Sequence, residues 1–498
     1  MVAPFFALSA VALLPLVQGS DWPQFRGPQG GANARGADVY PSRVDVDRPT
    51  WRTPLPPGHS SPCVHCDHIY VTAHRDRKLL TICLDSTTGR ELWRRSISVE
   101  SVERHHDING PASSTPAADG ECVVSYFGSF GLVAHDHEGE ELWRRPLAPQ
   151  RNTFGSAASP ILLDGRLLFV RDAQEGSTLE SIDAKTGEVA WKVDRARFES
   201  GWSTPTIVER DGVSELLVYG VWWLVAYDLA TGAERWRAPG LTDEPITSPV
   251  PAGDLVLVTS YNMKTNPEVE GLPTFAALLE ELDADGSGTL DAAEIERNES
   301  VLSRHDADGE GDHPLGIFMR WMDGDRDGEV TAGEWNKVVE WVDGFAHANG
   351  VLALRPPPAA PPAAPPAASD GPTPQAEIAW TFPRGVPECP SPVVASGRVH
   401  LVKNGGLATT LDAATGELLW QERLGARGPY YASPVVADGK VYACSARGEL
   451  TVFAAAARFE RLGRADFGER IMATPALAGG TLYVRTAEAL YAFGPSAR

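Results

Sequence analysis

The stretch Ser433-Pro-Val-Val-Ala-Asp-Gly-Lys-Val-Tyr442 decides the fold, because it holds a chain reversal between two short apolar runs. Asp-Gly between runs rich in β-branched residues is typical of a tight β-hairpin turn. The Ser/Thr-Pro pair that opens this unit recurs at Ser61, Thr115, Ser159, Thr204, Ser248, Ser391, Ser433 and Thr474. The intervals are 41 to 54 residues, except for one interval of 143. Such a period indicates a repeat protein that carries one insertion.

A second signature, D-x-x-T-G-x-x-x-W, closes most units. The copies end at Trp93, Trp191, Trp236 and Trp420, and a copy one residue shorter ends at Trp143. Asp and Gly supply a tight turn, and the Trp then begins a strand that packs over the neighbouring unit. Units of about 40–45 residues with four short strands describe a propeller blade. We therefore expect an all-β, eight-bladed β-propeller.

The two ends of the chain are expected to share one blade. Trp51 is an outer-strand Trp with no preceding strands of its own unit, whereas the last unit has three strands and no Trp strand after it. Joining the two closes the ring, with Phe459 as the weakest substitute for a missing Trp.

The first twenty residues, 1–20, combine an apolar run with small residues at its end, which is typical of a secretory signal peptide. The run is too short to cross a bilayer comfortably, so we expect no stable membrane span. The sequence therefore predicts an exported protein, periplasmic or extracellular, of a bacterial cell envelope. The formal net charge of −22 excludes a general nucleic-acid binder, because there is no basic surplus to neutralise phosphates.

Six cysteines are present, and an exported protein can form disulfides. Cys63-Val-His-Cys66 has C-x-x-C spacing, but Asp67 follows it, which excludes covalent haem attachment. For this pair we favour a structural or disulfide role over metal binding or redox chemistry.

The β pattern stops in the long interval, where an inserted helical pair of EF-hands is expected over 262–348 of blade five. A helical apolar face leads into the first loop, Asp283 to Glu294, which has the twelve-residue spacing of a calcium loop. Its expected ligands are Asp283, Asp285, Ser287, Thr289 (through its carbonyl), Asp291 (through water) and Glu294 (bidentate). Calcium suits these residues because it is a hard cation that takes six to eight oxygens.

The second loop, Asp323 to Glu334, repeats this spacing. Its expected ligands are Asp323, Asp325, Asp327, Glu329 (through its carbonyl), Thr331 and Glu334. Leu290 and Val330 both occupy loop position 8, where paired loops join by a short β-bridge. We therefore expect two calcium ions.

Charge and spacing define the rest of the insertion. Residues 262–348 hold 21 acidic and 6 basic residues, so most of the negative charge lies there. The segment 305–312 begins like a third loop, but Ile317 stands in place of the final Glu, and we interpret it as an acidic linker. The propeller thus occupies 21–261 and 349–498, with a stiff Pro/Ala-rich loop at 356–374.

One face of the propeller is expected to carry both the insertion and the long loop with His105, His106 and Asp107. Residues before each Ser/Thr-Pro should crowd the central funnel of that face: His59, Asn109, Phe154, Trp202, Glu244, Glu388, Tyr430 and Arg470. They could bind a protein or small-molecule ligand, or merely cap the channel.

The repeats resemble those of the quinoprotein-like propeller family, which includes pyrroloquinoline quinone (PQQ) alcohol dehydrogenases and an outer-membrane assembly scaffold. The resemblance covers roughly 50–262 and 349–494, and Trp22-Pro-Gln-Phe-Arg-Gly-Pro28 is similar to the start of exported bacterial members. It implies the eight-bladed fold, and either an enzyme or a scaffold.

Two features of the sequence argue against the enzyme interpretation. It lacks the adjacent Cys-Cys of PQQ dehydrogenases, and no Glu-Asn-Asp calcium set or catalytic Asp maps onto it. We expect a calcium-binding, non-catalytic binding or scaffold protein, with a PQQ-dependent alcohol or sugar oxidoreductase as the alternative.

Overall fold

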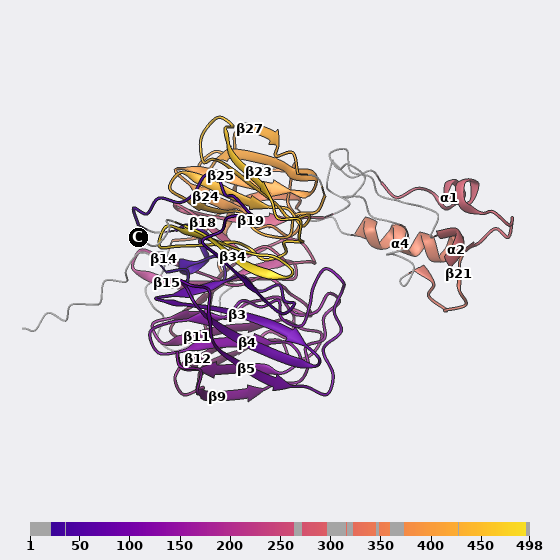
Figure 1. Ribbon diagram of the computed structural model, residues 1–498. Coiled ribbons are helices and arrows are strands. Elements are labelled where there is room, and N and C mark those ends of the chain that lie inside the picture. Colours follow the sequence, from indigo (N-terminus) through magenta and orange to yellow (C-terminus); the bar gives the residue numbers. More distant parts are fainter. Residues whose placement is uncertain are drawn as a thin grey trace, which may run out of the picture.

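Eight antiparallel four-stranded sheets make up the body of the protein. The computed structural model describes residues 21–34, 36–262, 271–295, 315, 322–344, 348–358, 373–426 and 428–494. Within this range the first strands of neighbouring sheets contact one another, including β2 (Cys63–His65) with β32 (Ala476–Ala478), which closes a ring. The prediction of an eight-bladed β-propeller is confirmed (Figure 1).

The strands follow one another along the chain in the order of the blades. Blade one contains β2 Cys63–His65, β3 His68–Arg75, β4 Lys78–Asp85 and β5 Glu91–Ser98, and blade two contains β6 Ala117–Ala118, β7 Val123–Phe127, β8 Gly131–His135 and β9 Glu141–Pro146. Blade three contains β10 Ile161–Leu163, β11 Arg166–Arg171, β12 Thr178–Asp183 and β13 Val189–Asp194, and blade four contains β14 Thr206–Arg210, β15 Val213–Gly220, β16 Trp223–Asp228 and β17 Glu234–Pro239. Blade five contains β18 Val250–Ala252, β19 Leu255–Ser260, β22 Gly350–Arg355 and β23 Glu377–Phe382, and blade six contains β24 Val393–Ala395, β25 Arg398–Lys403, β26 Leu407–Asp412 and β27 Leu418–Arg423. Blade seven contains β28 Val435–Ala437, β29 Lys440–Cys444, β30 Glu449–Ala454 and β31 Arg461–Asp466.

Blade eight joins the two ends of the chain, as predicted. It contains β32 Ala476–Ala478, β33 Thr481–Arg485 and β34 Ala489–Phe493, with β1 Trp51–Pro54 as its outer strand. Trp51 pairs with Ala492 and Pro54 with Ala489 in antiparallel register. The main-chain hydrogen bonds of one blade thus fasten the N-terminal region to the C-terminal region.

The Ser/Thr-Pro residues link neighbouring blades through a ring of hydrogen bonds. In six places the backbone N–H of one such residue donates to the hydroxyl of the equivalent residue in the next blade, at 2.9 to 3.0 Å. The donor–acceptor pairs are Ser61–Thr115, Thr115–Ser159, Ser159–Thr204, Ser248–Ser391, Ser391–Ser433 and Ser433–Thr474. The repeat needs Ser or Thr here because each buried N–H requires an acceptor.

The strand-four tryptophans dock on the following blade, as their spacing predicts. Six indole N–H groups donate to backbone carbonyls: Trp51 to Ser86, Trp93 to His137, Trp143 to Ala184, Trp191 to Leu229, Trp380 to Ala413 and Trp420 to Ala456. Each of five turn glycines lies so close to the ring that a Cβ would meet it at 2.4 to 2.9 Å: Gly89, Gly139, Gly187, Gly232 and Gly416. The glycine therefore provides both the positive φ of the turn and the space for the Trp ring.

The prediction that Phe459 replaces the missing Trp of blade seven is wrong. Gly463 takes the position beside the β-bulge that Trp420 takes in blade six. The N-terminal segment covers this glycine, since a Cβ there would lie 2.0 Å from the Ser42 carbonyl oxygen. Phe459 instead packs on the ring of Trp420, with centroids 5.2 Å apart.

The segment 22–34, which includes the short helix η1 (Pro28–Gly30), crosses the central channel. It contacts the inner strands of several blades, with bonds between Trp22 and Val64, Pro23 and Ala118, Gln24 and Leu162, Asn33 and Val394, and Ala34 and Val436. The buried Arg26 guanidinium donates to the carbonyls of Ser391 and Pro392 at 3.1 and 2.5 Å. The segment lies on the face where the inner strands end, and it closes the channel from that side.

A helical unit lies between the second and third strands of blade five, because β19 pairs directly with β22. It contains α1 Phe275–Leu282, β20 Leu290–Asp291, α2 Ala292–Ile295, β21 Glu329–Val330 and α4 Ala332–Gly344. These elements stand clear of the propeller (Figure 1). They have an apolar core of their own, which includes Phe275, Leu282, Ile295, Met322 and Trp335.

All six cysteines are described, and none forms a disulfide. Cys63 lies on β2 in the core, whereas Cys66 lies in the following turn and is exposed, so the disulfide interpretation of the C-x-x-C pair is wrong. Residues 1–20, the acidic linker 305–312 and most of the Pro/Ala-rich loop lie outside the described residues. None of the helices in the described part of the chain is long and apolar enough to cross a membrane.

Candidate calcium loops and funnel pocket

The first EF-hand loop follows α1, whose N-terminus is capped by Thr274. Asp283 Oδ2 accepts a hydrogen bond from Gly288 N at 3.0 Å, which folds the loop around the first carboxylate. Glu294 Oε1 accepts from Ala284 N at 2.8 Å, which brings the last loop residue back to the first turn. As a result, the carboxylates of Asp283, Asp285 and Glu294 approach within 4.8 Å of one another.

The second loop has the same two hydrogen bonds at the same positions. Asp323 Oδ2 accepts from Gly328 N at 3.1 Å, and Glu334 Oε1 accepts from Gly324 N at 2.9 Å. Here the grouped carboxylates are those of Asp323, Asp325 and Asp327. Both loops therefore close on a cluster of carboxylate oxygens.

Position 9 of each loop holds the N-terminus of the exit helix. Asp291 Oδ1 accepts from Glu294 N at 2.8 Å, and Thr331 Oγ1 accepts from Glu334 N at 3.3 Å. In the first loop, Ser287 Oγ lies 3.1 Å from Thr289 Oγ1.

The two loops are joined directly. Leu290 pairs with Val330 in antiparallel register, which confirms the expected bridge between positions 8. Thr289 Oγ1 also donates to Glu329 Oε2 at 2.6 Å across the gap. The buried Trp335 fixes the exit helix beneath the loops by donating from its indole to the Pro273 carbonyl at 2.9 Å.

The second candidate site is a pocket of about 760 Å³ at the centre of the propeller. It opens on the face where fourth strands connect to the next first strands, which is also the end of blade five from which the insertion leaves. Phe25 of the N-terminal segment lines it as well. Because that segment closes the channel from the other face, the pocket is a blind funnel.

Six of the eight predicted funnel residues line this pocket: His59, Asn109, Phe154, Trp202, Glu244 and Glu388, together with the long-loop residues His105, His106 and Asp107. The prediction is wrong for Tyr430 and Arg470, which do not line the pocket. Tyr430 is buried and donates to the Ala426 carbonyl, and Arg470 is exposed.

One fixed position of the sequence repeat would have identified the residues that line the pocket. The residue two positions before each Ser/Thr-Pro contributes to the pocket in all eight blades: His59, Ser113, Ala157, Trp202, Ile246, Cys389, Tyr431 and Met472. Only one residue separates this position from the hydroxyl ring, so the ring holds it close to the channel axis in every blade.

An aromatic wall lies on one side of the pocket. Phe154 contacts His106 and Trp202 edge to face, with ring centroids 5.5 and 5.4 Å apart. Trp202 is fixed by donation from its indole N–H to the Gly155 carbonyl at 2.8 Å. Asn109 donates to the Phe154 carbonyl at 2.8 Å and so ties the long loop to this wall.

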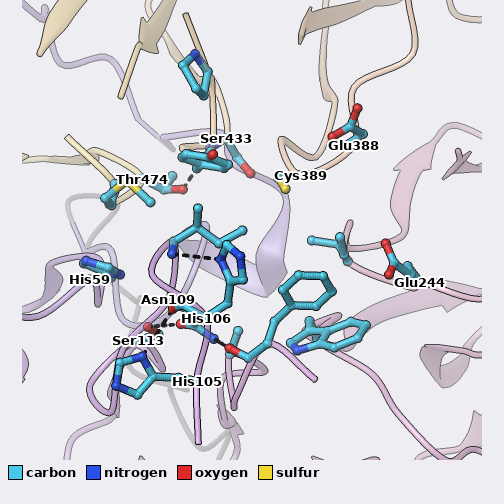
Figure 2. A pocket seen from close by; sticks show the side chains of 18 of the residues that line it. His59, His105, His106, Asn109, Ser113, Glu244, Glu388, Cys389, Ser433 and Thr474 are labelled. Atoms are coloured by element: carbon cyan, nitrogen blue, oxygen red, sulfur yellow. Dashed lines mark hydrogen bonds between the residues drawn. The ribbon is translucent and has the colours of Figure 1, made fainter. Parts of the chain in front are cut away.

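Titratable side chains face one another across the pocket, with the histidines on one side and the glutamates on the other (Figure 2). Desolvation by the surrounding funnel walls, with a smaller contribution from Asp243, raises the pKa of Glu244 to about 7, although its side chain is exposed to the pocket. Burial and the nearby Arg485 lower the pKa of His59 to about 4. At neutral pH the pocket thus holds an uncharged imidazole at His59 and a carboxyl at Glu244 that is close to its titration midpoint.

The fold and these sites define an eight-bladed propeller with EF-hand-type loops grafted onto one blade. A family model described as outer membrane protein assembly factor BamB matches residues 44–153, 81–263 and 373–496, and one described as EF hand matches residues 275–297. The first model covers more than half of the sequence, and the chain belongs to this family of PQQ-like repeat propellers.

The curated relatives cover smaller parts. The chain is 29% identical to outer membrane protein assembly factor BamB of Legionella pneumophila over 154 residues, which are 30% of this chain and 35% of that protein. It is 28% identical to methanol dehydrogenase [cytochrome c] subunit 1 of Methylorubrum extorquens over 179 residues, 32% of this chain and 26% of that protein. The chain thus spans about a third or less of the length of these relatives.

Among solved structures, the europium-containing methanol dehydrogenase aligns at a TM-score of 0.55 and 11% identity, covering 95% of this chain and 91% of that one. The quinohemoprotein alcohol dehydrogenase from Comamonas testosteroni aligns at 0.54 and 14% identity, covering 96% and 81%. At these identities the likeness extends to the fold.

Proposed function

We propose that this protein is an exported, calcium-binding β-propeller that acts as a binding or scaffold protein in the cell envelope. The observation that carries the calcium assignment is the repetition of one loop geometry. In both loops the first Asp accepts from the glycine at position 6 and the last Glu accepts from the residue at position 2. Hydrogen bonds of this kind preorganise the carboxylates for a hard cation, so little reorganisation is needed on binding.

The proposed ligands are those expected from the spacing: Asp283, Asp285, Ser287, Thr289, Asp291 and Glu294 in the first loop, and Asp323, Asp325, Asp327, Glu329, Thr331 and Glu334 in the second. Each loop offers three Asp and one Glu carboxylate, with the third Asp at position 9 in the first loop (Asp291) and at position 5 in the second (Asp327), so we expect the two ions to bind with comparable affinity. The bond between Thr289 and Glu329 then couples the two sites.

Calorimetry of the full chain tests this proposal. Wild type should bind two Ca²⁺ ions, and calcium should stabilise the helical unit by about 4 kcal/mol per site at a thousandfold excess over Kd. The double substitution Glu294→Gln and Glu334→Gln should abolish both the heat of binding and the stabilisation. Glu280→Gln on the exposed face of α1 is the matched control and should retain both. Equal calcium binding by the double variant would refute the proposal.

The pocket supports binding rather than redox chemistry. PQQ is a flat tricarboxylic acid, which requires cationic partners, but Glu244 and Glu388 occupy one side of the lining. The arginine in the lining is Arg104, whereas the buried Arg26 below the pocket is committed to three backbone carbonyls. These residues do not fit the quinone, and we derive no step through it. Addition of PQQ and calcium with a dye acceptor should give no alcohol or sugar oxidation; turnover would favour the oxidoreductase.

A further inference from the structure

The turn between β2 and β3 differs chemically from the corresponding turns of other blades. In blades three, four, six, seven and eight this turn ends in glycine, at Gly165, Gly212, Gly397, Gly439 and Gly480. In blade one it reads His65-Cys66-Asp67-His68, and Cys66 adopts a left-handed φ of 51°. The first turn residue has the same left-handed φ in blades three, four, six and seven, at Asp164, Asp211, Ser396 and Asp438, so blade one differs in residue type and not in conformation: a thiol between two imidazoles replaces the Asp-Gly or Ser-Gly pair.

Asp21 holds the His65 imidazole and the turn backbone together. His65 Nδ1 lies 2.8 Å from Asp21 Oδ2, and Cys66 N donates to Asp21 Oδ1 at 3.1 Å. A proton on Nδ1 leaves the lone pair of His65 on Nε2. A carboxylate that fixes the tautomer of a histidine in this way is characteristic of metal-binding histidines.

Nε2 of His65 and the thiol of Cys66, which contact each other, are spaced as two ligands of one ion. His65 Nε2 lies 3.7 Å from Cys66 Sγ. Zinc bonds of about 2.05 Å to nitrogen and 2.3 Å to sulfur, at a tetrahedral angle, place these atoms about 3.6 Å apart. The exposure of Cys66 gives an ion access from solvent.

Two more imidazoles stand beside this pair. The His137 ring, from the turn between β8 and β9 of blade two, lies 5.7 Å from the His65 ring and 5.8 Å from the His68 ring. His137 Nδ1 is 2.6 Å from the Tyr70 hydroxyl, whereas its Nε2 is buried without a hydrogen-bond partner among the described residues. The ring nitrogens of His68 and His137 do not belong to the group of donor atoms within 4.8 Å that Asp21, His65 and Cys66 form, so these two rings flank the pair.

We propose that His65 and Cys66 bind a transition metal ion of the zinc class. Asp21 is the positioning residue for His65, and the donor atoms of Asp21, His65 and Cys66 all lie within 4.8 Å of one another. Imidazole and thiolate donors select Zn²⁺ and related ions and disfavour Ca²⁺, which takes oxygen ligands. The site lies on the face opposite the funnel pocket, at the turns between first and second and between third and fourth strands.

Cobalt spectroscopy of the untagged full chain, in excess Ca²⁺ to fill the EF-hand loops, tests the proposal. One Co²⁺ per chain should produce a thiolate-to-metal charge-transfer band, and equimolar Zn²⁺ should remove it. Cys66→Ser should abolish the band, and His65→Gln should weaken binding at least tenfold. Cys389→Ser, a cysteine at the funnel pocket, is the matched control and should leave the band intact.

Asp21→Asn separates positioning from ligation. The variant should keep the charge-transfer band but bind about 10–100-fold more weakly. Cys66 is exposed, so its substitution should leave the melting temperature of the metal-free protein unchanged. The absence of a thiolate band in wild type, or an equal band in Cys66→Ser, would overturn the assignment. Disulfide-linked dimers without metal binding would also overturn it, because they would show an unligated surface thiol.

Discussion

Removal of one hydroxyl from the Ser/Thr ring tests what holds adjacent blades together at the pocket. Ser433 Oγ accepts the backbone N–H of Ser391 at 3.0 Å, and both residues are 2% exposed. The substitution Ser433→Ala leaves that N–H buried without an acceptor. An unsatisfied buried donor costs about 1–3 kcal/mol, so we expect the free energy of unfolding to fall by about 2 kcal/mol.

Two control variants separate the hydrogen bond from the loss of an oxygen atom. Ser433→Thr keeps the hydroxyl that other blades supply from threonine, and we expect a change below about 1 kcal/mol. Ser181 is also fully buried, but its hydroxyl has no partner among the described residues, so Ser181→Ala should be neutral or slightly stabilising. Urea unfolding followed by tryptophan fluorescence in saturating calcium measures all three. If Ser433→Ala and Ser181→Ala unfold at the same urea concentration, the ring does not stabilise the propeller.

Two further predictions concern the blade contacts and the pocket. Gly187→Ala should destabilise the propeller by about 1–3 kcal/mol more than Gly165→Ala. Both glycines have a positive φ, but only at Gly187 would the new Cβ meet a ring, that of Trp143 at 2.9 Å. Equal urea midpoints for the two variants would contradict this. Desolvation by the funnel walls raises the pKa of Glu244 from 4.5 to about 7. Between these pH values the folded state therefore holds a proton that the unfolded state has lost, and the contribution of Glu244 to stability, full below pH 4.5, disappears as the pH rises through about 7. Glu244→Gln should flatten this decline in unfolding free energy measured against pH, and a curve parallel to wild type would contradict it.

The repeat could be predicted from the sequence because each blade interface uses short-range signals. Ser/Thr-Pro and Asp-x-x-Thr-Gly mark the two ends of a blade, and the structure assigns each a contact with the next blade. Loop spacing likewise predicts the bridge between Leu290 and Val330, because the position of a residue within such a loop determines its partner.

Features that depend on register or on distant segments could not be predicted. Whether Phe459 or Gly463 takes the Trp position depends on a β-bulge, and Gly463 is needed because the backbone of Ser42 packs on it. The pairing of Asp21 with His65 was likewise hidden, because it joins an N-terminal residue to a turn that the sequence alone places in another unit.

Trp236 shows how one blade interface adapts to the insertion. The following blade has a Pro/Ala-rich connection in place of the Asp-x-x-Thr-Gly turn, so the carbonyl that accepts the indole N–H elsewhere is replaced. Trp236 Nε1 donates instead to Glu215 Oε2 at 3.1 Å, and Glu215 is held by Arg210 at 2.8 Å and Arg235 at 3.3 Å. All three charged residues lie in blade four with Trp236, so the indole N–H is satisfied within its own blade, and Arg210 Nη1 contacts blade five by donating to the Pro357 carbonyl at 3.1 Å.

The two proposed ion sites differ in the atoms that would bind the ion, and they lie at opposite ends of the blades. These differences determine whether one ion can occupy the other's site. The insertion leaves blade five at the end where β19 meets β22, and it presents carboxylate, hydroxyl and carbonyl oxygens. The β2–β3 turn lies at the other end of blade one and presents an imidazole and a thiol. Oxygen ligands favour calcium, and nitrogen and sulfur ligands favour zinc-class ions. We therefore expect that neither ion displaces the other from its site.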